Sequence, residues 1–244
     1  MRMAKGGPLS QSHARAKSDM PQAMVGMMII AVDGPAASGK GTLAFGLSQH
    51  YGLPHLDTGL LYRAVGCASE AFEDSDQFEA RAVEAARTLD AAHLTDIETL
   101  TSAKAGTLAS KVAVIAEVRQ ALFDFQRSFA LQPGGAVLDG RDIGTKICPD
   151  ADVKLFIKAD SKARMERRAR QFEGRGQVVD RYELYHQIEE RDARDMLNPN
   201  GGFYKADDAH LLDTTQLSIE AALRAAIAIV DRTMALKAGE HSFS

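Results

Sequence analysis

A glycine-rich segment between an apolar run and a helical pattern is the feature that most constrains this sequence. The apolar run ends at Val32, and residues 34–42 read GPAASGKGT. The spacing G-x-x-x-x-G-K is that of a phosphate-binding loop, whose backbone N–H groups turn inward around an anion. The helix that follows such a loop directs its positive end at the same anion. The spacing therefore predicts an α/β fold with a phosphate site after its first strand.

The loop residues have separate expected roles. Gly34 and Gly39 let the backbone approach a phosphate, Lys40 supplies a cation for the outer phosphates, and Thr42 offers a hydroxyl to a metal ion. The candidates for binding the phosphates of a cofactor are Gly34, Pro35, Ala36, Ala37, Ser38, Gly39, Lys40, Gly41 and Thr42. The strict motif has Ser or Thr directly after the lysine, where this chain has Gly41, and the G-K-G-T form resembles the loop of nucleoside monophosphate kinases. The alternative is a glycine-rich turn that binds nothing.

Five short apolar runs predict buried parallel strands, which are apolar on both faces. They lie at residues 28–32, 53–56, 136–138, 153–157 and 210–212. Helical patterns separate them, for example at 78–89, where Asp76 and Glu79 suggest a capping box, and at Val118, Leu122, Phe125 and Phe129. The alternation predicts a doubly wound, five-stranded parallel sheet of the P-loop NTPase type, with ligands at the carboxyl ends of the strands. The long spacers, roughly 63–130 and 165–205, are expected to be insertions that cover a substrate.

Composition excludes several classes of protein. Hydrophobic residues make up 45% and charged residues 25% of 244 residues, and the net charge of −4 argues against general binding of nucleic acid polymers. No apolar run approaches the length of a membrane span. The two cysteines predict reduced thiols in a cytoplasmic protein. Residues 1–26 are polar and basic and predict a disordered leader, with a transit peptide as the alternative.

Arginines recur where a polyanion would need them. Arg63 follows the second predicted strand, and Arg141 follows the third. Arg191, Arg194 and Asp195 share one face of a helical pattern. An arginine-rich helix carries Arg164, Arg167, Arg168 and Arg170. Each group has a plainer explanation, which is a structural ion pair or a solvated charged face. A bound nucleotide would give these guanidinium groups a common target, since arginine grips phosphate bidentately.

At this point the sequence resembles the bacterial cytidylate kinase family. The resemblance rests on AVDGPAASGKGT, LDTGLLYRA, SKVAVIAEVRQAL, LDGRDIGT, DADVKLFIKA, ERDARD and DDAHLLDTT, which occur in order over roughly residues 28–235. It implies transfer of the γ-phosphoryl group of ATP to CMP or dCMP, with Mg²⁺ as cofactor. It also implies a core at 27–62, 131–163 and 205–236, an NMP-binding insert at 63–130, a lid at 164–190 and a tail at 237–244. We expect a monomer whose partners are small-molecule nucleotides.

The resemblance also assigns residues by position. Those that would surround the CMP phosphate are Thr58, Arg63, Arg141 and Arg191, and those that would read the cytosine ring are Ser110, Arg119 and Asp142. Asp195 would accept a hydrogen bond from the ribose. Arg167 and Arg168 would close over the donor phosphates with the lid, and the catalytic set is Lys40, Arg141, Arg167 and Arg191.

The sequence departs from the family pattern in two places. The family usually carries another arginine near position 198, where this chain has Asn198, and Lys205 is the nearest later cation. The stretch between Leu89 and Ser110 is short and lacks an alternating strand pattern, so we expect helical or irregular structure there. Two other functions stay open from the residues, namely a kinase for UMP or another small substrate on the same core, and a non-catalytic nucleotide-binding switch.

Overall fold

The protein contains one five-stranded parallel sheet with the strand order β2-β3-β1-β4-β5. The structure, a computed structural model, describes residues 27–198 and 204–241. The strands are β1 Met28–Asp33, β2 His55–Asp57, β3 Gly135–Gly140, β4 Val153–Lys158 and β5 His210–Asp213. The predicted fold class is confirmed, and each strand overlaps an apolar run of the sequence. The predicted disordered leader lies outside the described residues.

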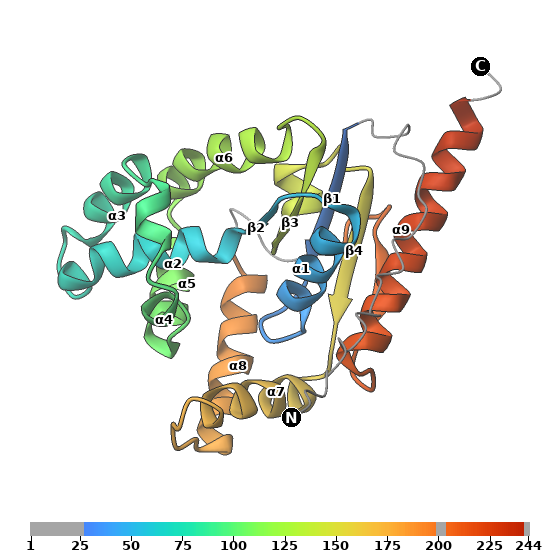
Figure 1. Ribbon diagram of the computed structural model, residues 1–244. Coiled ribbons are helices and arrows are strands. Elements are labelled where there is room, and N and C mark those ends of the chain that lie inside the picture. Colours follow the sequence, from blue (N-terminus) through green and yellow to red (C-terminus); the bar gives the residue numbers. More distant parts are fainter. Residues whose placement is uncertain (1–26, 199–203, 242–244) are drawn as a thin grey trace, which may run out of the picture.

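Alternate residues of β1 support two separate hydrophobic cores. Ile29 and Ala31 pack into a cluster that includes residues of α2 and α6, whereas Ile30 and Val32 pack into a cluster with α1 and α9. Figure 1 shows α9 along one side of the sheet and α2 to α6 on the opposite side. Both faces of β1 are therefore covered, as expected for a central parallel strand. At the edge of the sheet Leu211 of β5 is exposed, so only the central strands match the expectation of two buried faces.

The helices of the sheet and of the segment between β2 and β3 follow the predicted pattern with some differences. Their bounds are α1 Lys40–Tyr51, α2 Thr58–Ser69, α3 Phe78–Arg87, α4 Ile97–Leu100, α5 Ala103–Val112 and α6 Ala116–Ala130, with short 3-10 turns at Glu70–Phe72 and Ala91–Leu94. Residues 89–110 are therefore mainly helical, as expected from the missing strand pattern. The capping box predicted at Asp76 and Glu79 is wrong, because the residue at the N-cap of α3 is Gln77 and its side chain accepts no bond from the first turn.

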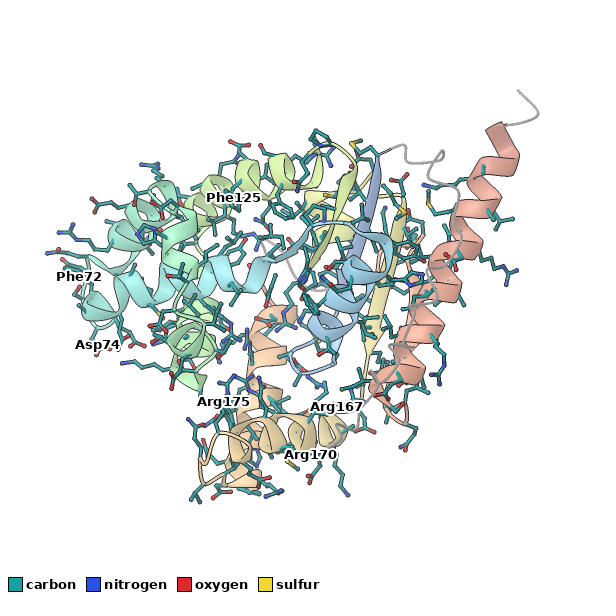
Figure 2. All side chains as sticks on the ribbon, in the orientation of Figure 1. Phe72, Asp74, Phe125, Arg167, Arg170 and Arg175 are labelled. Carbon is teal, nitrogen blue, oxygen red and sulfur yellow. The ribbon has the colours of Figure 1, made fainter. Side chains whose placement is uncertain are left out.

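The buried side of α6 also differs from the sequence pattern. Phe125, expected on the apolar stripe, is 39% exposed, while Gln126 is buried and donates from Nε2 to the carbonyl of Leu122. Figure 2 labels Phe125 on this helix. The buried residues of α6 are Val118, Leu122, Gln126 and Ala130, which recur every four residues. Gln126, whose side-chain amide is hydrogen-bonded within its own helix, thus occupies the core position that the sequence pattern assigned to Phe125.

Two helices after β4 form a small unit of their own. They are α7 Ser161–Glu173 and α8 Arg181–Met196, and their apolar faces meet in a cluster of Met165, Ala169, Phe172, Leu184 and Ile188. Asp180 caps α8 by accepting from the backbone N–H groups of Tyr182 and Glu183. Figure 1 shows this pair across one end of the sheet, next to α1.

The last helix, α9 Ile219–His241, is longer than the sequence pattern indicated. It continues into the residues expected to form a tail, so the tail is helical as far as His241. The bond from Tyr51 Oη to Asp231, at 2.8 Å, joins α1 to α9. Among the described residues, no helix combines the length and the apolar character needed to cross a membrane.

Candidate active site

The loop between β1 and α1 has a backbone that requires its glycines. Gly34 has φ +147°, and a Cβ there would lie 2.2 Å from the carbonyl oxygen of Ile157 on β4. Gly39 has φ +91° and directly precedes α1 in the left-handed conformation. Ala37 also has a positive φ, of 56°, which a residue with a side chain adopts only at a cost. The strained loop places its backbone N–H groups at the N-terminus of α1, which is the positive end of the helix dipole.

Lys40 is the cation at the start of α1. Its Nζ lies 3.5 Å from the carbonyl oxygen of Pro35 within the loop. Burial and nearby Arg141 lower the pKa of Lys40 to about 8, although Asp139 and Asp57 act to raise it. A lysine held this way gains from a phosphate anion beside it, because the anion restores the charge that burial opposes.

Three arginines hold the outer side of the loop. Each donates from Nη1 to a different backbone carbonyl, at 2.9, 3.2 and 3.0 Å: Arg141 to Gly34, Arg164 to Ala36 and Arg167 to Ser38. Arg167 also donates to both the hydroxyl and the carbonyl of Thr214. Side chains from the end of β3 and from α7 thus fix alternate carbonyls of one loop.

The residues after β2 begin α2 at the edge of the site. The Asp57 carboxylate caps α2 by accepting from the N–H of Gly59 at 2.9 Å. Burial and the nearby Asp139 raise the pKa of Asp57, while Lys40 lowers it. Thr58 is buried and donates from Oγ1 to the carbonyl of Asp139 at 2.9 Å, so its hydrogen points at the backbone in this conformation.

Four guanidinium groups converge where the sheet, α2, α7 and α8 meet. Burial is the main cause that lowers the pKa of Arg63, that of Arg168 to about 10 and that of Arg191 to about 9. Repulsion adds to it, since Arg141, Arg63 and Arg168 each lower the pKa of Arg191. Four partly buried cations at this density favour an anion of high charge.

Arg63 is oriented by the insert between β2 and β3. Its Nη1 donates to the carbonyl of Leu100 at 2.7 Å and to that of Ser102 at 3.4 Å. Gly106 of α5 leaves the space for this group, because a Cβ there would lie 3.1 Å from Nη1 of Arg191 and 3.8 Å from Nη2 of Arg63. A helix position without a side chain therefore faces two of the converging arginines.

The residues expected to read a base also come together. Arg119 of α6 forms an ion pair with Asp142, and its guanidinium lies 5.9 Å from the ring centre of Tyr62. Burial raises the pKa of Asp142, and Arg119 lowers it. Ser110 of α5 is buried and donates to the carbonyl of Gly106 at 3.3 Å.

The buried carboxylate of Asp33, the last residue of β1, binds the segment that follows β3. Asp33 accepts from the N–H groups of Ile143 and Gly144, both at 2.8 Å. Burial raises the pKa of Asp33 to about 7 in spite of these bonds. The bonds fix the turn that carries Arg141 and Asp142 beside the loop.

All of these groups surround a cavity of about 680 Å³. The predicted site residues that line it are Ala36, Ala37, Gly39, Lys40, Gly41, Thr42, Thr58, Arg63, Ser110, Arg119, Arg141, Asp142, Arg168, Arg191 and Asp195. Asp195 forms an ion pair with Arg141 at 2.6 Å. Gly34, Pro35, Ser38 and Arg167 are not among the described residues that line the cavity.

The lid arginines take different positions. Arg167 binds the outer side of the loop, as described above, whereas Arg168 faces the cavity and donates from Nη2 to the carbonyl of Thr101 at 3.3 Å. Figure 2 labels Arg167 on α7 and Arg175 in the turn after it. Arg175 donates to the hydroxyl of Thr101 at 3.0 Å, so two arginines of the lid bind the same residue of the insert.

Asn198 stands where the sequence suggested a missing arginine. It is buried, lines the cavity and donates from Nδ2 to the carbonyl of Ala113 at 3.0 Å. Lys205 binds backbone carbonyls of its own segment, those of Ala206, Asp207 and Ala209. In this conformation Lys205 is not among the described cavity-lining residues.

Two residues of the site were missed by sequence reasoning. They are Gly106 and Asp33, although Asp33 directly precedes the loop motif. Asp139, in the polar stretch at the end of β3, lies within hydrogen-bond distance of Nε2 of His55, at 2.7 Å, and lines the cavity. A polar residue at the end of a buried strand is the signal that could have indicated Asp33.

The donors near Thr42 fit a magnesium ion. Thr42, Asp57 and Asp139 all line the cavity, and Mg²⁺ prefers oxygen ligands from one or two carboxylates together with substrate phosphates. Among the described residues, no group of three or more acidic, histidine or cysteine side chains is arranged to hold a metal by itself. A metal at this position would therefore depend on phosphate oxygens.

The loop after the first strand of a parallel sheet, with a cationic cavity beside it, defines the class of P-loop phosphotransferases. The comparisons with known proteins narrow this class. The family model described as Cytidylate kinase matches residues 30–232. The chain belongs to the cytidylate kinase family, as the resemblance implied.

The similarity to curated relatives extends over most of the chain. A protein named "Cytidylate kinase" from Xanthobacter autotrophicus is 56% identical over 204 residues, which cover 84% of this chain and 97% of the relative. A protein of the same name from Methylocella silvestris is 53% identical over 219 residues, covering 88% of this chain and all of the relative.

Proposed function

We propose that the protein transfers the γ-phosphoryl group of ATP to CMP or dCMP and releases ADP and CDP or dCDP. The observation that carries the proposal is the cavity into which Lys40, Arg63, Arg141 and Arg191 all converge. Two nucleotides bring phosphates that repel each other, and buried cations offset that repulsion as the phosphates approach. A switch that binds one nucleotide has no use for a second set of arginines.

The donor phosphates would bind at the loop. Its backbone, the start of α1 and Lys40 face the cavity at one end, and Arg167 would join them if the lid moved further down. Mg²⁺ fits beside Thr42 and would supply positive charge between the donor phosphates. Asp139 would hold its hydration shell from the end of β3.

The acceptor would bind between the insert and α8. Arg63, Arg141 and Arg191 would grip its phosphate, and Asp195 would accept from the ribose. Cytosine carries a ring acceptor beside an exocyclic amine, which matches the donor Arg119 beside the acceptor Asp142. When the base binds, Arg119 and Asp142 would either separate from each other or keep their contact and each form an additional hydrogen bond to the base.

The transfer needs no strong base. An oxygen of the CMP phosphate forms a bond to the γ-phosphorus, and the bond from that phosphorus to the bridging oxygen of ADP breaks. The residues position the two oxygens in line, and the arginines offset the charge that spreads over the transferred group. The lid excludes water, which would otherwise accept the phosphoryl group.

Steady-state assays with ATP, Mg²⁺ and each of CMP, dCMP, UMP, AMP and GMP test the proposal. CMP and dCMP are expected to be the best acceptors. Asp142→Asn should lower kcat/KM for CMP by about tenfold or more, because it removes a charged acceptor for the exocyclic amine. Preference for a purine nucleotide, or ATP binding without transfer to any acceptor, would contradict the proposal. The monomeric state and the cytoplasmic location stay predictions.

A further inference from the structure

Arg164 of α7 connects the phosphate loop to α8. Its side chain is buried and donates from Nη1 to the carbonyl of Ala36 at 3.2 Å and from Nη2 to the hydroxyl of Ser161 at 3.0 Å. Nη2 also forms an ion pair with Asp192 Oδ2 at 2.5 Å. One guanidinium group therefore bridges the loop of the donor site and the helix that carries Arg191.

A second bridge has the same construction. Arg141 donates to the carbonyl of Gly34 and forms an ion pair with Asp195. Asp192 and Asp195 lie three residues apart, so they share one side of α8. Two carbonyls of the loop are thus joined through two arginines to two carboxylates one turn apart.

The Arg164 bridge differs from the Arg141 bridge in one respect. Arg141 and Asp195 line the cavity, whereas Arg164 and Asp192 are not among the described residues that do so. The pair is also tightly enclosed: Nε of Arg164 and Oδ1 of Asp192 are buried and have no hydrogen-bond partner. Because each charge depends on the other, loss of either partner leaves a buried charge uncompensated.

We propose that the ion pair between Arg164 and Asp192 is a positioning device that sets the separation between the phosphate loop and Arg191. Arg191 directly precedes Asp192, so a shift of Asp192 moves the acceptor arginine relative to the loop. The inference rests on the proposed function, because that separation is the distance between donor and acceptor phosphates. Phosphoryl transfer depends on in-line alignment, and small misplacements cost far more in rate than in binding.

The test compares kcat with the binding of each nucleotide alone. In Arg164→Ala and Asp192→Asn, kcat should fall by about 10- to 100-fold. The dissociation constants of ATP alone and of CMP alone, measured by calorimetry, should change by less than about threefold, because neither side chain lines the cavity. Arg164→Lys restores the charge but lacks the planar fork, so it should recover thermal stability more fully than kcat.

Lys162→Ala is the matched control. Lys162 is exposed on the same helix, and its replacement should leave kcat unchanged. If the pair acts as a unit, the double variant Arg164→Ala with Asp192→Asn should be no slower than the slower single variant. The proposal would be overturned if the fold loss of kcat in the double variant equalled the product of the two single losses. A fall in ATP affinity that matches the fall in kcat would overturn it as well.

Misfolding and failure of the proposed function have separate signatures. Asp192→Asn keeps an acceptor for Arg164, so it tests the pair even if Arg164→Ala does not fold. An Asp192→Asn variant that keeps the kcat of the unsubstituted chain would overturn the positioning role while leaving CMP phosphorylation intact. Absence of transfer to every monophosphate by the unsubstituted chain would instead overturn the proposed function, and the inference with it.

Discussion

Lys40 is partly buried, and under its proposed role beside the donor phosphates its pKa of about 8 gives a testable pH dependence. Below that value the free protein presents an ammonium group to ATP, and above it the group loses its proton. We expect kcat/KM for ATP to fall as the pH rises through about 8, because kcat/KM reports on the free protein. The kcat value should fall less, since bound phosphates raise the pKa of Lys40. Profiles from about pH 6.5 to 9.5 measure both.

Lys40→Arg is the control for this dependence. A guanidinium group keeps its charge over the whole range, so the residual kcat/KM of this variant should lack the alkaline fall. An equal fall in both proteins would assign the dependence to another group.

At the residue scale the sequence predicted the phosphate loop and many of the charged side chains that line the cavity, and the limits of that prediction are physical. Lys40 and Gly39 belong to a local motif whose spacing forces the loop, and Arg141 follows a strand whose end can be located. Asp139 and His55 form a pair from two different strands, so neither segment alone indicates it. The partner of Arg164 lies on another helix, and no local pattern identifies it.

At the element scale, α5 carries a glycine that helix stability alone would not choose. Gly106→Ala should raise the free energy of unfolding by about 0.5–1 kcal/mol, because glycine is a poor helix former. The new Cβ would lie 3.1 Å from Nη1 of Arg191, so that group must shift. We expect KM for CMP to rise by about threefold or more in the same variant. Thermal unfolding and steady-state kinetics measure the two opposite effects.

Gly239→Ala on α9 is the matched control for this substitution. A Cβ there meets no atom within 4 Å, so this variant should gain stability without any change in KM. Unchanged KM in both variants would show that Gly106 leaves no needed space for the arginines.

The sequence predicted elements well where apolar periodicity is strong and less well where local polar bonds decide. The central strands are continuous apolar runs, a pattern typical of parallel strands that are buried on both faces. On α6 the stripe was assigned to Phe125, but the buried position belongs to Gln126, whose amide is satisfied by its own helix. Hydrophobicity alone cannot rank these two residues, because the hydrogen bond that permits burial depends on helix geometry.

At the scale of the whole molecule, the lid and the insert meet at Thr101. Thr101→Val removes the hydroxyl that accepts from Arg175 and leaves the backbone contact with Arg168. Trypsin cleavage after Arg175 should accelerate by about 2- to 10-fold, since one hydrogen bond contributes about 0.5–1.5 kcal/mol. Timed digestion followed by mass spectrometry measures the rate at that bond.

Thr88→Val is the control for the lid contact. Thr88 is exposed and binds a carbonyl of its own helix, α3, so its loss should not change cleavage after Arg175. Equal acceleration in both variants would mean that Thr101 does not restrain the lid.

The ion pair between Arg119 and Asp142 joins α6 of the insert to the segment after β3. Under the proposed role, a change of acceptor base would have to alter both partners, because either one alone leaves a buried charge behind. Evolution of a new acceptor preference on this scaffold would thus require two coupled substitutions in separate segments, with the single-step intermediates impaired. The pair would therefore make it difficult for descendants of such a chain to change the base that they recognise in the acceptor.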